Sequence, residues 1–287
     1  MCRFVAYLGK PVMADELLIK PKNSLLSQSF HALESEMTVN GDGFGLGWYD
    51  KSIREEPALF RSIRPAWNDE NLIYNAAMIK SNCIFGHIRA ATNGSVSIPN
   101  CHPFHYDRYL MMQNGGIHDF VKIKRAIMER LHNEPFEWIQ GQTDTQYIFA
   151  LFMTIVLEYE KQRPLPLEDI KICFSRTFAE IEEMKKAAGL TSPSLYNMVL
   201  TDGRRMVATR YSTKPEEDTR SLHIARISEF QISDKGHLKF KNEEEADNSV
   251  LISSEILSKE KGYWQEVPEN SCVMVNKNCE VTIEPMA

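Results

Sequence analysis

Hydrophobic residues in the first part of the chain occur in short runs with Gly, Asn or Pro nearby. Runs of this kind, rich in β-branched and aromatic residues, are typical of β-strands. We expect strands at Cys2–Leu8, Phe44–Tyr49, Ala58–Ile63, Cys83–Ala90 and Arg108–Gln113. Apolar residues spaced by three or four predict helices instead. These lie at Leu25–Leu33, Asn71–Lys80 and about Asp119–Leu131.

The middle of the chain has the longer periodicity of helices. Thr143–Gln146 has the form of a capping box, in which two side chains satisfy free backbone N–H groups at a helix start. It opens an apolar run that ends near Tyr159, and a second helix is expected over Leu167–Ala188, before Gly189. Strands then return at Leu195–Leu200, Arg205–Tyr211, Leu222–Ile227, Ser249–Ile252 and Cys272–Asn276.

The order of these elements indicates the fold class. Strands, then two helices, then strands favour an α+β protein with two sheets and helices packed on them. Polar stretches at Ser212–Arg220 and Asp234–Asn248 predict exposed loops. Because no segment marks a clean boundary, we expect residues 1–287 to form a single domain.

Composition and charge argue against several classes of function. The 287 residues include 33 basic and 39 acidic side chains, which gives a formal net charge of −6. A negative charge argues against a nucleic-acid or anionic-membrane binder, and the longest apolar stretch, Tyr147–Leu157, is too short to span a bilayer. Charged residues between Arg3 and Lys20 interrupt any signal-peptide core. The six cysteines are therefore expected to be reduced thiols in a cytoplasmic protein.

Cys2 differs from the other cysteines because it follows the initiator methionine. Its small side chain permits removal of Met1, which would leave an α-amine and a thiol on one residue. An α-amine has an unperturbed pKa of about 7.7–8.0, so part of it is neutral near physiological pH and can act as a base. Thiol and amine would then form a nucleophile–base pair. The alternative is that Cys2 only begins a buried strand.

Three polar clusters could bind a substrate beside such a nucleophile. Arg89 and Thr92 follow one predicted strand and could hold a carboxylate, with the planar guanidinium bidentate. Asn114 and Gly115 could direct N–H donors at a developing oxyanion, and Asp144, at a helix start, could bind an ammonium group. Each cluster also has a structural explanation: a surface ion pair, a short Asn-Gly turn and an ordinary first-turn aspartate.

Two further segments suggest ligands that we do not expect. Asn40–Gly47 is rich in glycine but lacks the Gly-Lys-Ser/Thr of a phosphate loop and the order of a dinucleotide fingerprint, so a tight turn before a strand explains it better. Cys101, His102 and His105 could form a zinc module, but no second ligand pair follows at a suitable spacing. We predict neither a metal nor a cofactor.

The motifs together resemble a known family. They are Met1-Cys-Arg-Phe, Asn40-Gly-Asp-Gly-Phe-Gly, Gly86-His-Ile-Arg-Ala-Ala-Thr92, Asn100-Cys-His-Pro-Phe104, Asn114-Gly and Thr143-Asp144. In this order they resemble the class II glutamine amidotransferases, which are glutaminases with an amino-terminal nucleophile. The pattern looks closest to a stand-alone branch that includes a yeast glutathione-degradation subunit and a γ-glutamyl hydrolase of the ergothioneine pathway.

The resemblance implies a four-layer αββα fold, with catalytic motifs in 2–160 and helices and strands that complete the sandwich in 161–287. It also implies a role for each candidate residue: nucleophilic attack by Cys2, an oxyanion hole from Asn114 and Gly115, a carboxylate site from Arg89 and Thr92, and an ammonium site from Asp144. The expected activity is cleavage of a small γ-glutamyl substrate through a Cys2 thioester, either by the chain alone or with a partner subunit.

The departures from the family pattern concern specificity. Asn93 and Gln113 stand where the family often has histidine, which leaves the γ-glutamyl donor open. A second hypothesis is a catalytically inactive subunit with a regulatory or scaffold role. Retention of Met1 would favour this hypothesis, because the amine of Cys2 would then be part of a peptide bond and could not act as a base.

Overall fold

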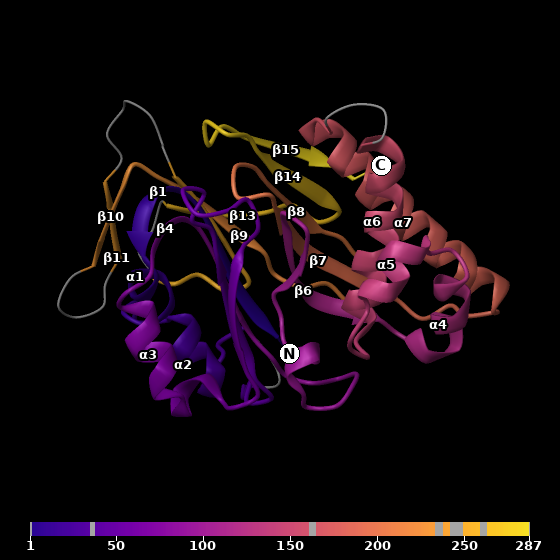
Figure 1. Cartoon of the computed structure of the whole chain (residues 1–287), viewed down its shortest axis with the longest axis horizontal. Coiled ribbons are helices and arrows are strands. Elements are labelled where there is room, and N and C mark those ends of the chain that lie inside the picture. The colour runs from indigo at the N-terminus through magenta and orange to yellow at the C-terminus, as the bar shows by residue number, and fades with distance from the viewer. Residues whose placement is uncertain are drawn as a thin grey trace.

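Two antiparallel β-sheets lie face to face between two layers of helices in the computed structural model of the chain (Figure 1). The structure describes residues 2–34, 38–160, 165–232, 238–241, 249–258 and 263–286. The αββα arrangement and the α+β class that the sequence predicts are confirmed.

The first sheet is built around the amino-terminal strand. Over the described residues it has seven strands, in the order β13 (Trp264–Glu266), β9 (His223–Ile227), β12 (Ser249–Ser253), β1 (Arg3–Met13), β4 (Lys80–Ile88), β2 (Phe44–Trp48) and β3 (Ala58–Ser62). β1 pairs with β12 on one side and with β4 on the other, so Val5 lies between Ser253 and Gly86. The start of the chain is thus held in the middle of a sheet.

The second sheet faces the first. Its strands, counted in the same described ranges, are six in the order β15 (Val281–Pro285), β14 (Ser271–Val275), β8 (Met206–Arg210), β7 (Ser194–Thr201), β6 (Tyr109–Ile117) and β5 (Phe104–Tyr106). A separate antiparallel pair consists of β10 (Glu229–Ile232) and β11 (Leu238–Lys241).

Alternate side chains of β1 belong to two different cores. Phe4 and Ala6 point between the sheets, into a cluster that includes Met112. Val5 belongs instead to the cluster on the outer face, with Leu17. All of these side chains are buried. A strand with both faces buried reads as a continuous apolar run, which is why the amino terminus of the sequence shows little alternation.

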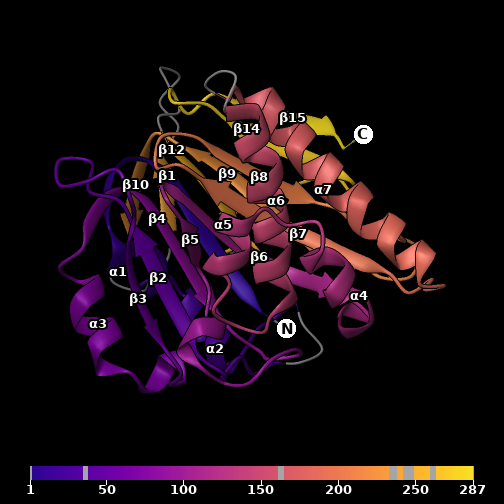
Figure 2. The same ribbon diagram turned by 45° about the vertical axis from the view of Figure 1, so that its right-hand side comes forward.

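Two groups of helices form the outer layers. Short helices α1 (Ala14–Leu18), α2 (Leu25–Phe30) and α3 (Glu70–Ala76) lie on the seven-stranded sheet. Helices α4 (Phe120–Met128), α5 (Asn133–Trp138), α6 (Asp144–Glu160) and α7 (Leu167–Ala187) cover the six-stranded sheet (Figures 1 and 2). Two 3₁₀ turns, η1 (Ala66–Asn68) and η2 (Ile98–Asn100), lie in connections.

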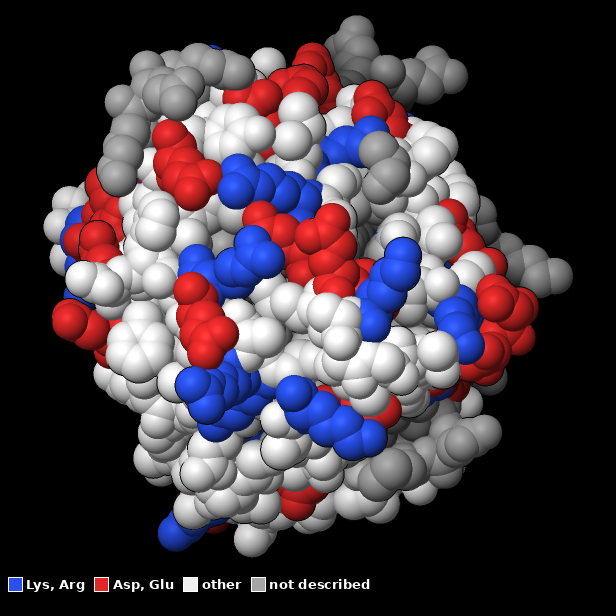
Figure 3. All heavy atoms as spheres, turned by 90° about the vertical axis from the view of Figure 1, so that its right-hand side faces the viewer, with Lys and Arg blue, Asp and Glu red and all other residues white. Residues whose placement is uncertain are grey.

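The inner and outer sides of the second helical layer differ in burial and charge. Helix α6 is buried from Asp144 to Val156, because sheet and helices surround it. On the outer surface, acidic and basic side chains are interspersed (Figure 3). There Arg176 of α7 lies 2.9 Å from Glu158 and 3.0 Å from Glu180. None of the described helices has the length and hydropathy needed to cross a membrane.

The structure differs from the sequence predictions in three places. The strand predicted to end at Gln113 continues to Ile117, so Asn114 and Gly115 belong to a β-ladder and the Asn-Gly turn is wrong. Leu238–Lys241 is a strand rather than a loop, because it pairs with β10; the rest of the polar stretch 234–248 lies outside the described residues. Finally, the sequence did not predict the short elements α1, α5, β5, β10, β13 and β15.

Candidate active site

Cys2 immediately precedes β1 and its side chain is half-buried. The pairing of Arg3 with Ile88 brings the end of β4 beside it, and Cys2 Sγ lies 3.5 Å from the carbonyl oxygen of Ala90. Burial raises the pKa of the Cys2 thiol, while the hydrogen bond to Ala90 and the charges of Arg89 and Arg3 oppose that rise. A thiol with a raised pKa is protonated at neutral pH, so it needs a base before it can attack a carbonyl.

Asn114 and Gly115 lie on β6 of the opposite sheet. The side chain of Asn114 is buried, and its Nδ2 lies 3.5 Å from Ser254 Oγ. An amide group carries two N–H donors, so this weak contact leaves a donor for a ligand. At Gly115, a Cβ would lie 2.2 Å from the carbonyl oxygen of Leu195 on β7. Any side chain at this position would push the two strands apart, so glycine is required there.

Four of the six predicted site residues line a single cavity. Cys2, Thr92, Asn114 and Gly115 lie in the wall of a cavity of about 660 Å³, a volume in the usual range for sites that bind small molecules. Another cavity, of about 690 Å³, lies beside residues 131–134 and contains none of the predicted residues. The first cavity is therefore the candidate active site. Residues in or next to both sheets line it, although Cys2 and Asn114 are far apart along the chain.

Arg89 does not line this cavity. Its side chain is buried, and its guanidinium donates hydrogen bonds to the carbonyl oxygens of Ser95 (3.0 Å), Asn93 (2.9 Å) and Gly94 (3.3 Å). Arg89 therefore holds the loop that follows Thr92, whose side chain does line the cavity. Since a guanidinium has five N–H donors, these three contacts do not use all of its capacity.

Asp144 also lies behind the cavity wall. It is buried at the start of α6, and its carboxylate accepts hydrogen bonds from the backbone N–H of Ile117 (2.8 Å) and Thr145 (3.0 Å). Burial raises the pKa of the carboxyl group, and these hydrogen bonds counteract the rise. Gly116 separates Asp144 from the cavity, and a Cβ there would lie 2.7 Å from Asp144 Oδ2. A side chain at Gly116 would therefore clash with the Asp144 carboxylate.

The zinc hypothesis for Cys101, His102 and His105 does not agree with the structure. The ring of His102 packs against His87, with ring centroids 4.1 Å apart, while the side chain of His105 is exposed on β5. Cys101 Sγ lies 3.5 Å from the carbonyl oxygens of Ser62 and Ser97. Across the described ranges, no group of three His, Cys, Asp or Glu side chains is arranged to hold a metal ion.

His87 instead contacts β6, the strand that carries Asn114 and Gly115. Its Nε2 lies 3.1 Å from the carbonyl oxygen of Gln113, the residue before Asn114. Burial lowers the pKa of His87 to about 3, so the ring is neutral at physiological pH. A neutral imidazole with Nε2 protonated can donate to that carbonyl, which fixes the backbone of β6 beside the candidate oxyanion donors.

Another part of the cavity wall is formed by residues that the sequence did not indicate. This part of the wall consists of the β6–α4 connection and the start of α4, residues 118–122. Two residues from distant loops, Ser192 and Arg220, complete it. Asp119 has a left-handed backbone (φ 62°) and forms an ion pair with Lys122 at 3.0 Å. The polar His118-Asp119 step directly after the Asn114 motif was a usable signal. Ser192 and Arg220 gave none, because only the fold brings them here.

Comparison with known proteins decides the family. The sequence profile of the family described as "Glutamine amidotransferases class-II" matches residues 18–285. The chain belongs to this family. The class II amidotransferases are enzymes, and two curated relatives extend over nearly the whole chain.

One relative is the probable glutamine amidotransferase DUG3 of Saccharomyces cerevisiae, which is 36% identical over 293 aligned positions that cover 96% of this chain and 82% of the yeast protein. Another is the γ-glutamyl-hercynylcysteine sulfoxide hydrolase of Mycolicibacterium smegmatis. It is 32% identical over 290 positions that cover all of both chains.

Solved structures support the same fold. A glutamine aminotransferase class-II domain protein from Silicibacter pomeroyi superposes with a TM-score of 0.68 at 22% identity, over the full length of both chains. The glutamine phosphoribosylpyrophosphate amidotransferase of Bacillus subtilis superposes with a TM-score of 0.60 at 13% identity, over 49% of that chain. At these identities the likeness concerns the fold alone.

Proposed function

We propose that this class II amidotransferase cleaves a γ-glutamyl amide through a thioester on Cys2, as a hydrolase or as a transferase. The observation that supports the proposal most is the shared cavity, which places a thiol opposite a strand that carries an amide side chain and a glycine N–H. The names of the relatives, a probable glutamine amidotransferase and a γ-glutamyl sulfoxide hydrolase, concern the same class of bond.

The first half of the proposed reaction forms the thioester. After removal of Met1, the α-amine of Cys2 takes the thiol proton, and the sulfur attacks the γ-carbonyl carbon. Asn114 Nδ2–H and the Gly115 N–H stabilise the oxyanion that develops on the carbonyl oxygen. The C–N bond then breaks, and the proton held by the α-amine moves to the departing nitrogen.

The second half releases the acyl group. Water, or an acceptor amine in a transferase, attacks the thioester carbonyl and gives a proton to the α-amine. The C–S bond breaks, and the thiolate takes back that proton. With water the product is glutamate. Because burial raises the pKa of the Cys2 thiol, a base on the same residue serves both halves.

The α-substituents of the glutamyl group would bind at the sides of the cavity. In this proposal Arg89 and Thr92 hold the α-carboxylate, with Arg89 using the donors that its loop contacts leave. Asp144 holds the α-ammonium across Gly116. The support is the position of each group: Thr92 in the wall, and the Asp144 carboxylate behind a glycine whose Cβ would block it.

We also propose that residues 1–287 act as one catalytic domain in the cytoplasm, alone or with a partner subunit. The family match over residues 18–285 supports the single domain. The six cysteines are free, which is the state that the reducing cytosol maintains.

The test is a panel of γ-glutamyl donors, namely glutamine, glutathione and γ-glutamyl-cysteine, with glutamate release as the measured quantity. Intact mass of the purified protein first establishes that Met1 is absent. We expect Cys2→Ala to abolish release from every donor. The matched control is Cys279→Ala, which removes the other half-buried thiol and is expected to retain activity. Turnover by Cys2→Ala, or retention of Met1 in an active enzyme, would contradict the proposed mechanism.

A further inference from the structure

Arg3 is a fully buried arginine next to the nucleophile. Only 1% of its surface is exposed, and all three of its guanidinium nitrogens have partners. Nε donates to Glu255 Oε1 at 2.6 Å, Nη1 to the carbonyl oxygen of Cys2 at 2.9 Å, and Nη2 to the carbonyl oxygen of Glu34 at 2.7 Å. One planar group thus holds residue 2 together with two segments that are distant in the sequence.

Glu255 completes this arrangement from the other side. Its carboxylate is also fully buried, and it accepts hydrogen bonds from the backbone N–H groups of Leu33 and Glu34, both at 3.0 Å. Its own carbonyl oxygen accepts a bond from Ser253 Oγ at 2.6 Å. The carboxylate is therefore fixed by its backbone and by three donors, and it in turn fixes the direction of the Arg3 side chain.

The residue before Glu255, Ser254, contacts β6, the strand that carries Asn114. Ser254, between β12 and Glu255, forms two hydrogen bonds with the backbone of Phe4: Ser254 N–H donates to Phe4 O at 3.1 Å, and Phe4 N–H donates to the side-chain Oγ of Ser254 at 3.1 Å. Ser254 Oγ also lies 3.5 Å from Asn114 Nδ2. Ser254 therefore contacts Asn114 directly, while Glu255 is linked to Cys2 through Arg3.

A buried ion pair is a poor means of stabilising a fold. Removing two charges from water costs much of what their attraction returns, and apolar replacements of such pairs are often as stable. The planar fork of arginine, by contrast, fixes direction at several acceptors at once. Cys2 also lies before the first pair of the β1–β4 ladder, Arg3 with Ile88, so the ladder does not hold its carbonyl group.

We propose that Arg3 and Glu255 are positioning residues that fix Cys2 opposite Asn114. This inference rests on the proposed function, since it assigns the pair to the placement of that nucleophile. Neither residue touches the reacting atoms: Glu255 acts through Arg3, and Arg3 acts through the backbone of Cys2.

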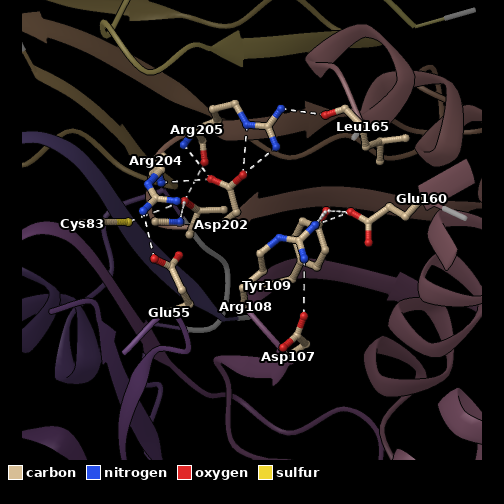
Figure 4. A network of polar contacts seen from close by, with 12 residues as sticks. Glu55, Cys83, Asp107, Arg108, Tyr109, Glu160, Leu165, Asp202, Arg204 and Arg205 are labelled. Atoms are coloured by element: carbon tan, nitrogen blue, oxygen red, sulfur yellow. Dashed lines mark hydrogen bonds and ion pairs between the residues drawn. The ribbon is translucent and has the colours of Figure 1, made fainter. Parts of the chain in front are cut away.

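The main test is Glu255→Gln, which keeps the shape and an acceptor but removes the charge. The control is Asp202→Asn, at the far end of β7 from the cavity, where Asp202 pairs with Arg205 at 2.6 Å (Figure 4). For each protein we would measure Tm, kcat and KM for the best donor per folded molecule, and the rate at which iodoacetamide alkylates Cys2, read on the amino-terminal peptide.

We expect Glu255→Gln to lower kcat about 10- to 100-fold, because a small misplacement of a reacting group has effects of this size. KM should stay close to the wild-type value, and alkylation of Cys2 should become faster as residue 2 loosens. Asp202→Asn should lower Tm and leave kcat and alkylation unchanged. If Glu255→Gln does not fold, Arg3→Lys, which keeps the charge but loses the fork, carries the same expectations.

A Glu255→Gln protein that loses Tm but keeps wild-type kcat and wild-type alkylation of Cys2 would overturn the inference, because the pair would then be only structural. The proposed function can fail separately. If the wild-type protein releases no glutamate from any donor, the alkylation rate alone decides: faster alkylation supports a positioning role for the pair, and an unchanged rate refutes it.

Discussion

The two ends of the β-sandwich both bury polar side chains, but they pair them differently. At one end, Asp202 accepts hydrogen bonds from Arg205 Nε and Nη2 and from the backbone of the turn that follows it (Figure 4). At the other end, Cys2, Thr92 and Asn114 lie in the wall of a cavity of about 660 Å³. At the first end, both oxygens of the Asp202 carboxylate are bonded within the protein, so we expect this network to stabilise the fold. The second leaves groups that a substrate can use.

The Arg3–Glu255 pair combines both properties. Its hydrogen bonds are closed within the protein, as at the Asp202 end, yet one of them ends on the carbonyl group of Cys2. The comparison therefore separates two kinds of effect. Substitutions at the closed end should change stability and leave turnover alone, while substitutions at the cavity should do the opposite.

After substitution of Cys2 itself, the largest effect on turnover is expected from Asn114→Ala. Loss of one oxyanion donor should lower kcat about 10²- to 10³-fold. The change in Tm should be small, because the contact of Asn114 with Ser254 is long at 3.5 Å. Steady-state kinetics and a thermal scan on the same preparation measure both quantities. A variant with near-normal kcat would remove Asn114 from the oxyanion hole.

For Asp202→Asn we expect a loss of stability without a loss of turnover. The charged hydrogen bonds to Arg205 are lost, which should lower the free energy of unfolding by about 1–3 kcal/mol. The kcat should not change, because Asp202 lies at the far end of β7. Denaturant unfolding and kinetics test this pair of expectations. A large loss of kcat at unchanged stability would show that the two ends are not independent.

A further expected effect concerns the dependence of stability on pH. The pKa of His87 is lowered by burial to about 3, so between the ordinary histidine pKa of about 6.5 and that value the unfolded chain binds a proton that the folded chain does not. Stability should therefore fall with decreasing pH in this window, by about 1.4 kcal/mol per pH unit from His87.

His87→Gln tests this expectation. The variant should show a shallower dependence of the unfolding free energy on pH between 6.5 and about 5 than the wild type, whatever its stability at pH 7. Burial also lowers the pKa of His102, which contacts His87, so part of the dependence should remain. An unchanged slope would mean that His87 is protonated in the folded protein.

Much of the fold could be predicted from the sequence. Strands such as β1 and β12 are apolar on both faces, and helix α6 is buried along most of its length, so hydrophobic runs located them. The elements that the sequence missed are short or polar. Helix α5 has only six residues, with Pro135 in its first turn. Strand β11 has only four residues, and its alternation of Leu, Lys, Phe and Lys lies inside a long polar stretch. Such short segments give a weak signal, and their pairing or packing partners are distant in the sequence or equally short.

The site was predictable only in part, for a similar reason. Cys2, Asn114 and Gly115 lie in motifs whose residue types suit the chemistry, and the structure places them at one cavity. Arg89 and Asp144 have suitable types but lie behind the wall, which spacing along the chain does not indicate. The pairing of Arg3 with Glu255, 252 positions apart, follows from the meeting of β1 and β12 and had no signal in the sequence.

The central claim is a thioester on Cys2, and the most direct test is to trap it. The enzyme, freed of Met1, would be mixed with its best donor, quenched in acid during turnover and digested, and the peptides weighed by mass spectrometry. The account predicts a peptide that begins at Cys2 and carries one added glutamyl group, released by hydroxylamine and absent in Cys2→Ser. Turnover without any such adduct on Cys2, or with the adduct on another residue, would contradict it.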